Sequence, residues 1–472
     1  MNKLSFTALA CAGLLSACSL MPGYQRPPAP IPANWPVSQA FDSVKNDSYQ
    51  RNEDKGWRHF FLDKTLQELI TLAVANNRDL RVAVLNIELA RAQLGIRRAD
   101  QFPTLNAALS GSRTPNSSGE ISSSYSGGLI VTAYELDFFG RVASLKEQAL
   151  AQYLASTEAS ATIQISLMAT VAQSWLSLLA DEELLAASRQ TLASREQSLA
   201  LVELKLRHGA ASELDVRLAQ TLLESARVTL AQQQRQRALD ENALVLLLGR
   251  ALPAAALAAR TGGSLASLQL ADMPAGLPSD LLTRRPDIRQ AEQLLIASNA
   301  SIGAARAAFF PRIALTTGAG SASSALSGLF KDGSWGWTFS PQLVLPIFDA
   351  GRNQANLDAA RAARDIAIAQ YEKAIQSAFR EVADALAGGD TLARQLKASQ
   401  ALLQAESGRT RLTKLRFDNG AASQLDWLDA QRSLFAAQQA LVQTRLAALQ
   451  NQVTLYKALG GGLLAVTANG LP

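Results

Sequence analysis

The stretch GAASELD that begins at Gly209 returns as GAASQLD from Gly420, and this duplication decides the fold. In each copy the glycine can adopt a positive φ and end an incoming helix. Ser212 and Ser423 then stand where they can cap the next helix, each with an aspartate three residues later, the spacing of a capping box. The two copies therefore predict two sharp helical hairpins.

Three further landmarks recur in the same order and at nearly the same spacing. They are Asp79–Ala83 with Asp287–Ala291, Phe102-Pro103 with Phe310-Pro311, and Gly140-Arg141 with Gly351-Arg352. Ordered recurrence of this kind indicates an internal duplication. We predict two tandem helix–β-hairpin–helix repeats, at 57–250 and 280–460, joined by a linker at 251–279.

The distribution of proline locates the helices. No proline occurs between residues 115 and 253, or between residues 346 and 472. Helix interiors exclude proline, because it lacks the N–H donor and clashes with the preceding turn. We therefore predict very long helices at 141–207 and at about 351–418, each followed by the second helix of its hairpin.

Two adjacent glycines, Gly388 and Gly389, interrupt the second long segment. Each costs about 1 kcal/mol relative to alanine in a helix interior. The sequence thus predicts a kink or a break at this point.

Two segments poor in helix formers, about 104–135 and 312–347, are predicted to be β-hairpins. In the second, Trp335, Trp337 and Phe339 alternate, which places three aromatic rings on one face of a strand. Three aliphatic residues continue the alternation: Leu343, Leu345 and Ile347. The pattern fits a soluble hairpin with an aromatic face, or a membrane hairpin with aromatic residues at the interface.

Two hairpins supply four strands, too few to close a barrel. In lipid, an open sheet edge leaves backbone groups unpaired at a cost of several kcal/mol each. A membrane location would therefore require several copies of the chain. Three copies would give twelve strands, although this physical argument does not select the number three.

The N-terminus resembles a bacterial lipoprotein signal. A positive Lys3 and a short apolar stretch precede LSAC at 15–18, so residues 1–17 are predicted to be removed and Cys18 to be acylated. An ordinary signal peptide is the alternative. Residues 18–56 begin with a proline-rich stretch that predicts an extended leash, and 461–472 form a C-terminal tail. No transmembrane helix is expected after the signal.

Composition excludes several functions. The net charge of +5 is small and its charges are interspersed, which argues against nucleic acid as a partner. The two histidines, His59 and His208, lack metal-ligand spacing, and no nucleotide-binding loop or nucleophile elbow occurs. We expect no enzyme activity, no metal and no cofactor other than the lipid on Cys18.

Four segments carry a resemblance to a known family. They are LPSDLLTRRPDI at 277–288, IGAAR at 302–306, YELDFFGR at 134–141 and LDAQRSL at 428–434. With these segments the chain resembles the TolC-type outer-membrane factors, in the lipoprotein (OprM- or NodT-like) branch that serves RND efflux pumps.

The resemblance implies a mainly α fold with a transmembrane β-barrel. In such a fold a homotrimer forms a long α-barrel and a twelve-stranded β-barrel, four strands from each chain. It also implies a lipid-anchored protein in the outer membrane of a Gram-negative bacterium, extending into the periplasm. Its partners would be outer-membrane lipid, a periplasmic adaptor and an inner-membrane RND-type pump, and its function a passive duct for drugs or other small toxic compounds.

The family closes its periplasmic end with an acidic ring and a hydrophobic ring at the second hairpin. Matched residue by residue, the acidic positions fall on Asp426 and Asp429 and the hydrophobic one on Leu425. Capping alone explains Asp426, because Asp215 occupies the same place in the first repeat. Asp429 has Leu218 as its counterpart, so capping does not explain it. Converging carboxylates would favour cations and raise some of their pKa values.

Two other functions remain open at this point. One is an outer-membrane duct for type I protein secretion. The other is a coiled-coil lipoprotein that spaces the envelope without transport, which predicts no membrane strands.

Overall fold

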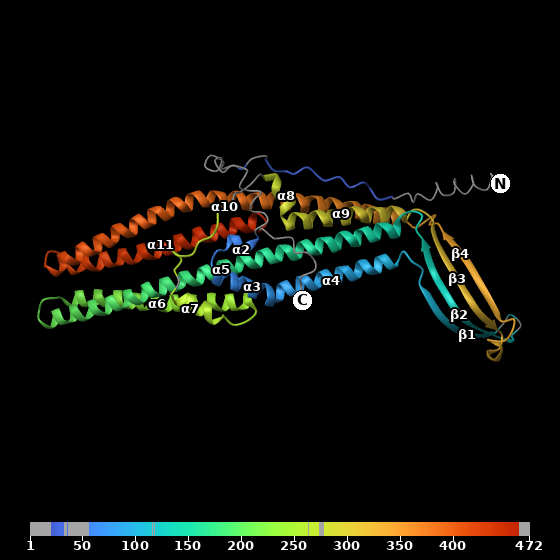
Figure 1. Ribbon diagram of the computed structural model, residues 1–472, viewed down its shortest axis with the longest axis horizontal. Helices are drawn as coiled ribbons and strands as arrows, with labels where there is room; N and C mark the ends of the chain where they lie inside the picture. The colour runs from blue at the N-terminus through green and yellow to red at the C-terminus, as the bar shows by residue number, and fades with distance from the viewer. Residues whose placement is uncertain are drawn as a thin grey trace. The chain divides into compact units, whose positions relative to one another are not determined.

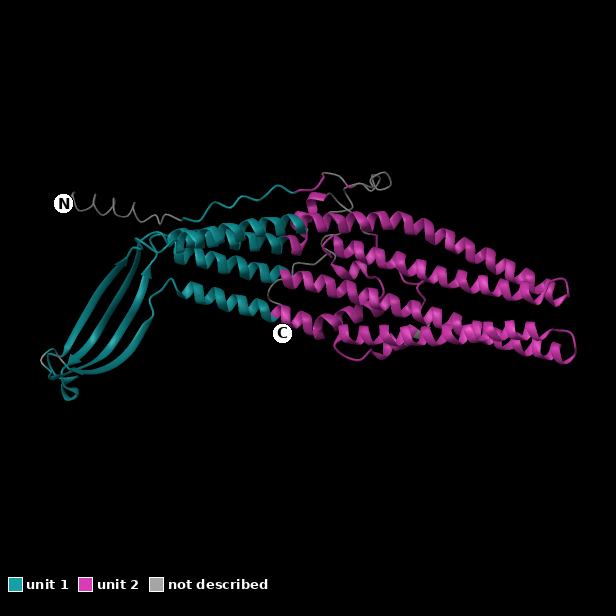
Figure 2. Ribbon diagram, turned by 180° about the vertical axis from the view of Figure 1, so that it is seen from behind, with its two compact units in different colours: residues 1–29, 85–158, 289–374 teal, residues 30–84, 159–288, 375–472 magenta. Residues whose placement is uncertain are grey.

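The computed structural model describes residues 20–32, 35, 56–115, 117, 119–262, 264–272 and 278–461. The predicted signal sequence, Cys18 and the tail beyond residue 461 lie outside the described residues. Figure 2 shows two compact units, one of residues 1–29, 85–158 and 289–374 and the other of residues 30–84, 159–288 and 375–472. Each unit draws on both sequence repeats, because the long helices run through both.

The chain is mainly helical. Its two longest helices are α5 (Arg141–Arg207) and α10 (Arg352–Asp418), and each is followed across a tight turn by a shorter partner, α6 (Glu213–Leu248) or α11 (Gln424–Ala458) (Figure 1). The remaining helices are α2 (Trp57–Phe60), α3 (Lys64–Asn76), α4 (Arg78–Ala99), α7 (Ala254–Gly262), α8 (Leu281–Arg284) and α9 (Pro286–Ala307). The long helices lie where the absence of proline predicts them.

Helix α10 continues from Arg352 to Asp418 through Gly388 and Gly389, so a break at this point, one of the two expected outcomes, is wrong. The reason is packing rather than helix propensity. A Cβ atom on Gly388 would lie 2.5 Å from Oδ1 of Asn451 on α11, and the Asn451 amide donates a 2.8 Å hydrogen bond to the Ala385 carbonyl. The glycine lets two helices approach closely.

The four strands form one antiparallel sheet in the order β1-β2-β3-β4 (Figure 1). They are β1 (Leu105–Pro115), β2 (Ile121–Leu136), β3 (Arg312–Ser323) and β4 (Trp335–Val344). Each strand is long enough to cross a bilayer, because a tilted strand needs about 9–11 residues to do so. Strand β4 ends at Val344, so the predicted alternation does not extend to Leu345 and Ile347.

The register gives the sheet one apolar and one polar face. Trp337 pairs with Ala319, Ala319 with Leu129, and Leu129 with Ala107, so these four side chains share a face. The same face carries most of the large apolar residues of the sheet: Leu105, Leu109, Tyr125, Val131, Ile313, Leu315, Trp335, Phe339 and Leu343. The other face is mainly serine, threonine, glycine and alanine.

Both edge strands, β1 and β4, are exposed along their whole length in the single chain. The apolar face is also largely open: Trp335 is 68% exposed and Leu109 is 74% exposed. A sheet that is open at both edges and apolar on one face is an incomplete structure in water and in lipid alike.

Among the described helices, α5 alone contains an 18-residue window apolar enough to cross a membrane, and 61% of that window is buried within the protein. It contributes Met168 and Trp175 to a core that also contains Phe61, Leu244 and Tyr456. This degree of burial is typical of a helix that packs in the interior of the protein.

Candidate functional site

The first helical hairpin turns at Gly209. This residue has φ of 72°, and the N–H of Ala210 donates a 2.8 Å hydrogen bond to the Lys205 carbonyl, which closes the end of α5. Helix α6 then begins with a capping box. Ser212 Oγ accepts a hydrogen bond from the Asp215 N–H at 3.2 Å, and the Asp215 carboxylate accepts one from the Ser212 N–H at 2.8 Å.

The second hairpin reproduces this turn. Gly420 has φ of 74°, and Ala421 donates to the Arg416 carbonyl at 2.7 Å. Ser423 Oγ accepts from the Asp426 N–H at 3.1 Å, and the Asp426 carboxylate accepts from the Ser423 N–H at 2.8 Å. The hydrogen bonds from Ser423 lower the pKa of Asp426, as those from Ser212 lower the pKa of Asp215. Both aspartates thus act as caps within one chain.

Each turn also presents a leucine one residue before its capping aspartate. Leu214 is 78% exposed and Leu425 is 61% exposed. The hydrophobic side chain expected at the second hairpin therefore has a counterpart at the first, which the sequence comparison did not single out.

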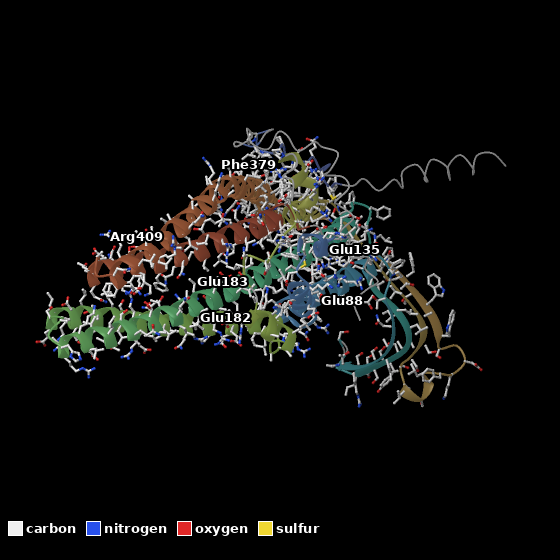
Figure 3. The ribbon with its side chains drawn as sticks, turned by 60° about the vertical axis from the view of Figure 1, so that its left-hand side comes forward. Glu88, Glu135, Glu182, Glu183, Phe379 and Arg409 are labelled. Carbon is white, nitrogen blue, oxygen red and sulfur yellow. The ribbon has the colours of Figure 1, made fainter. Side chains whose placement is uncertain are left out.

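Asp429, one turn further along α11, differs from its counterpart Leu218 because it is ion-paired. Its carboxylate accepts a 2.6 Å hydrogen bond from Arg432 on the same helix and a 3.4 Å one from Arg409 on α10. Arg409 is labelled in Figure 3, on the helix that leads to the second turn. It also binds Glu406 at 2.7 Å, and its acidic neighbours raise the pKa of Arg409.

The second hairpin contacts the first through Gln431. The Gln431 amide accepts a 2.7 Å hydrogen bond from Arg195 of α5 and donates a 2.9 Å one to Ser194. Arg195 is 4% exposed, and its burial, together with the nearby Arg432, lowers its pKa. Asp429 thus lies two residues from a buried contact between α5 and α11.

The arginine partners of Asp429 were missed at the level of sequence. The spacing of Asp429 and Arg432, three residues apart in a helix, could have indicated their ion pair. Arg409 is twenty residues away across a turn, and no local pattern identifies it. In the described part of the chain no cluster of histidine, cysteine or carboxylate side chains has the arrangement of a metal site.

Residues 69–250 and 277–461, more than half of the chain, match the family described as outer membrane efflux protein. The chain belongs to the outer membrane efflux protein family. The match falls in two segments, one in each repeat.

Two relatives from Pseudomonas putida are each 49% identical over 469 residues, covering 98% of this chain and 96% of their own length. One is named antibiotic efflux pump outer membrane protein ArpC, and the other toluene efflux pump outer membrane protein TtgC. A solved structure, the open state of the Neisseria gonorrhoeae MtrE outer membrane channel, is 40% identical with a TM-score of 0.84, covering 94% of this chain and 98% of that one.

These comparisons show the protein to be a TolC-type outer-membrane efflux channel, as the resemblance implied. Its relatives are channel proteins rather than enzymes. The four-stranded sheet and the long helical hairpins are accordingly the two parts of an outer-membrane duct.

Proposed function

We propose that this chain forms a homotrimeric, passive duct for drugs or other small toxic compounds, which closes at the α10–α11 hairpin. The observation that carries the proposal is the sheet. It has one apolar face, one polar face and two unpaired edges within the described chain. Closing three such sheets edge to edge would pair every strand, turn the apolar faces to lipid and line a lumen with the polar faces.

The closed state would be held by three residues of the second hairpin, and one of them, Asp429, has no acidic counterpart in the first. Leu425, Asp426 and Asp429 are the proposed constriction, repeated three times around the axis. The Arg409–Asp429 contact joins α10 to α11, so separation of these two helices would break it. Surface ion pairs contribute about 0–1 kcal/mol each, weak enough for a partner protein to open.

The proposed exported compounds and partners follow from the relatives. Their names specify antibiotics and toluene, so drugs and other small toxic compounds are the proposed cargo of this chain. A periplasmic adaptor and an inner-membrane RND-type pump would supply selection and energy, since no nucleotide-binding motif occurs in the sequence. Acylation of Cys18 would anchor each chain in outer-membrane lipid.

The two competing functions are less well supported. A non-transporting spacer would not need a sheet with an exposed apolar face, which this chain has. A duct for type I secretion would use a similar architecture, but the relatives are named for efflux pumps.

The direct test is planar-bilayer conductance of the purified full-length protein, run beside a native mass measurement. We expect a trimer with discrete conductance steps. A monomer that inserts no channels would contradict the proposed duct, and conductance from a trimer that exports only a protein substrate in cells would favour type I secretion.

A further inference from the structure

The first described residues of the proline-rich segment, Leu20–Arg26, are bound to the protein surface. We call Leu20–Arg26 the leash segment. It lies on α9, where Glu292 accepts two 2.6 Å hydrogen bonds from the Arg26 guanidinium and a 3.0 Å one from the Tyr24 hydroxyl. Glu292 is only 8% exposed. A buried carboxylate bound in this bidentate way is a built contact, because guanidinium and carboxylate match in shape as well as charge.

Two further side chains of α9 bind the backbone of the leash segment. The Asn299 amide donates a 2.8 Å hydrogen bond to the Pro22 carbonyl, and Arg306 donates a 3.1 Å one to the Leu20 carbonyl. Between them, a Cβ atom on Gly303 would lie 3.0 Å from Met21. The same Cβ atom would lie 2.5 Å from Oγ of Ser144 on α5, so the glycine leaves room for both α5 and Met21.

The four α9 residues Glu292, Asn299, Gly303 and Arg306 form one stripe, which we call the leash seat. Steps of seven, four and three residues keep them on one helix face. The fourteen steps from Glu292 to Arg306 rise by about 21 Å at 1.5 Å per residue. The six steps from Leu20 to Arg26 span about 20 Å in an extended chain. The leash segment and the seat therefore match in length as well as in chemistry.

The first repeat provides an internal comparison, because α4 is the counterpart of α9 at a shift of 208 residues. The positions that correspond to the leash seat are Val84, Arg91, Gly95 and Arg98. Val84 cannot accept the Arg26 guanidinium, and Arg91 replaces the Asn299 amide with a charge of the same sign as Arg26. Gly95 and Arg98 keep the residue types of Gly303 and Arg306. Nothing lies within 4 Å of a Cβ atom placed on Gly95. The two repeats therefore share this helix, but of the two counterparts only α9 carries the full set of residues that binds the leash segment.

With Cys18 acylated as proposed, the seat would also limit how far the lipid can lie from α9. Arg306, which binds Leu20, stands six residues before Arg312, the first residue of β3. Cys18 is two residues before Leu20, so the covalent chain cannot separate them by more than about 7 Å. The acyl chains would be attached beside the point where the sheet begins.

We propose that the leash seat fixes the lipid anchor at the start of the sheet, so that acylation and insertion of the sheet are coupled through Glu292. Without the seat, a flexible linker from Cys18 to Trp57 would let the anchor take many positions, and acylation would only tether the chain. With it, the anchored lipid holds the apolar face of the sheet at the height of the membrane. This inference rests on the proposed acylation and membrane insertion.

The first experiment measures seating alone, by limited chymotrypsin cleavage after Tyr24 in the purified oligomer, followed by mass detection of the released residues 18–24. We expect Glu292→Gln to speed cleavage by about tenfold or more, because hydrogen bonds to a charged group are lost. Arg26→Lys should fall between wild type and Arg26→Ala, since it keeps the charge and loses the bidentate geometry. Glu88→Gln on α4 removes an equivalent charge from an exposed pair with Arg91 and should change nothing.

The second experiment measures coupling, as the fraction of protein recovered from outer membranes as an SDS-resistant oligomer. Cys18→Ser and Glu292→Gln should each lower this fraction, and the double variant should be no worse than Cys18→Ser. Unchanged cleavage in Glu292→Gln would overturn the seat. Faster cleavage with full oligomer recovery, or additive losses in the double variant, would overturn the coupling.

These outcomes are separable from the proposed duct. The mass of the released fragment reports acylation by itself. Loss of conductance with an intact seat would contradict the duct and leave the seat standing.

Discussion

The two helical hairpins begin with the same seven-residue turn and differ one helical turn later. At the first, Asp215 caps α6 and the next acidic position is occupied by Leu218. At the second, Asp426 makes the same capping box, and Asp429 binds Arg409 and Arg432. Comparison of the two turns thus separates the residues that cap a helix from a residue that is present in one hairpin only. The capping aspartate is common to both hairpins, and the ion-paired aspartate belongs to the second alone.

The two repeats also differ at the ends of the hairpins that lie away from the turns. Asp181 on α5 and Asp240 on α6 are close enough to interact, whereas the corresponding residues in the second repeat are Leu392 and Asn451. Burial, with a contribution from Asp240, raises the pKa of Asp181 to about 7. Its Oδ2 atom has no hydrogen-bond donor in the described chain. A proton on Asp181 would supply the missing hydrogen bond between the two carboxyl groups.

The largest expected effect comes from making the first repeat resemble the second at this pair. Folding raises the pKa of Asp181, so this residue contributes to folding stability in its protonated form. The contribution is complete below the ordinary pKa of 3.8 and is lost as pH rises to about 7. Asp240→Asn introduces a donor for Asp181 and should raise the unfolding temperature at pH 8 while flattening this dependence. Each pKa unit corresponds to about 1.4 kcal/mol. Thermal unfolding from pH 4 to pH 8 measures it, and an unchanged slope would refute the shared proton.

A second change tests the glycine that helix propensity misjudged. Gly388→Ala should destabilise the α10–α11 pair by about 1–2 kcal/mol, because strain of about 1–3 kcal/mol against Asn451 exceeds the gain of about 1 kcal/mol in helix propensity. Gly389→Ala is the matched control, since its Cβ atom would meet Asn451 only at 3.8 Å. Chemical unfolding compares the two. Equal effects would mean that Gly388 is not needed for packing.

The smallest expected effect concerns the caps. Ser212→Ala and Ser423→Ala should each lower the free energy of unfolding by about 1 kcal/mol, the usual cost of losing a serine cap. Because the two capping boxes have the same geometry, the two losses should be equal within error. A much larger loss at Ser423 would show that the second turn does more than begin a helix.

The sequence was sufficient for the fold because its strongest signals are local. Absent proline marks α5 and α10, and Gly209 with Ser212 marks a turn. The alternation in β1 and β2 was too weak to interpret alone, because Ser110 and Gly111 carry little contrast. Only the register with β3 shows that both strands share its apolar face.

What the sequence could not predict depends on partners distant along the chain. Helix propensity alone suggests that Gly388 weakens the helix. Its packing role could not be predicted, because its neighbour Asn451 lies on another helix. The ion pair of Asp429 with Arg409 could not be predicted, since Arg409 is brought to it only by the turn. The role of Glu292 could not be predicted, because its partner Arg26 is 266 residues away in the sequence.

The proposed constriction is tested most directly by single-channel conductance of Asp429→Ala beside Asp215→Ala and wild type, in purified full-length protein. Asp429→Ala should raise conductance and weaken block by divalent cations, because it removes the carboxylate that binds both Arg409 and Arg432. Asp215→Ala should leave both quantities at the wild-type value. Unchanged conductance and block in Asp429→Ala, or equal changes in the two variants, would contradict a gate that depends on the second hairpin.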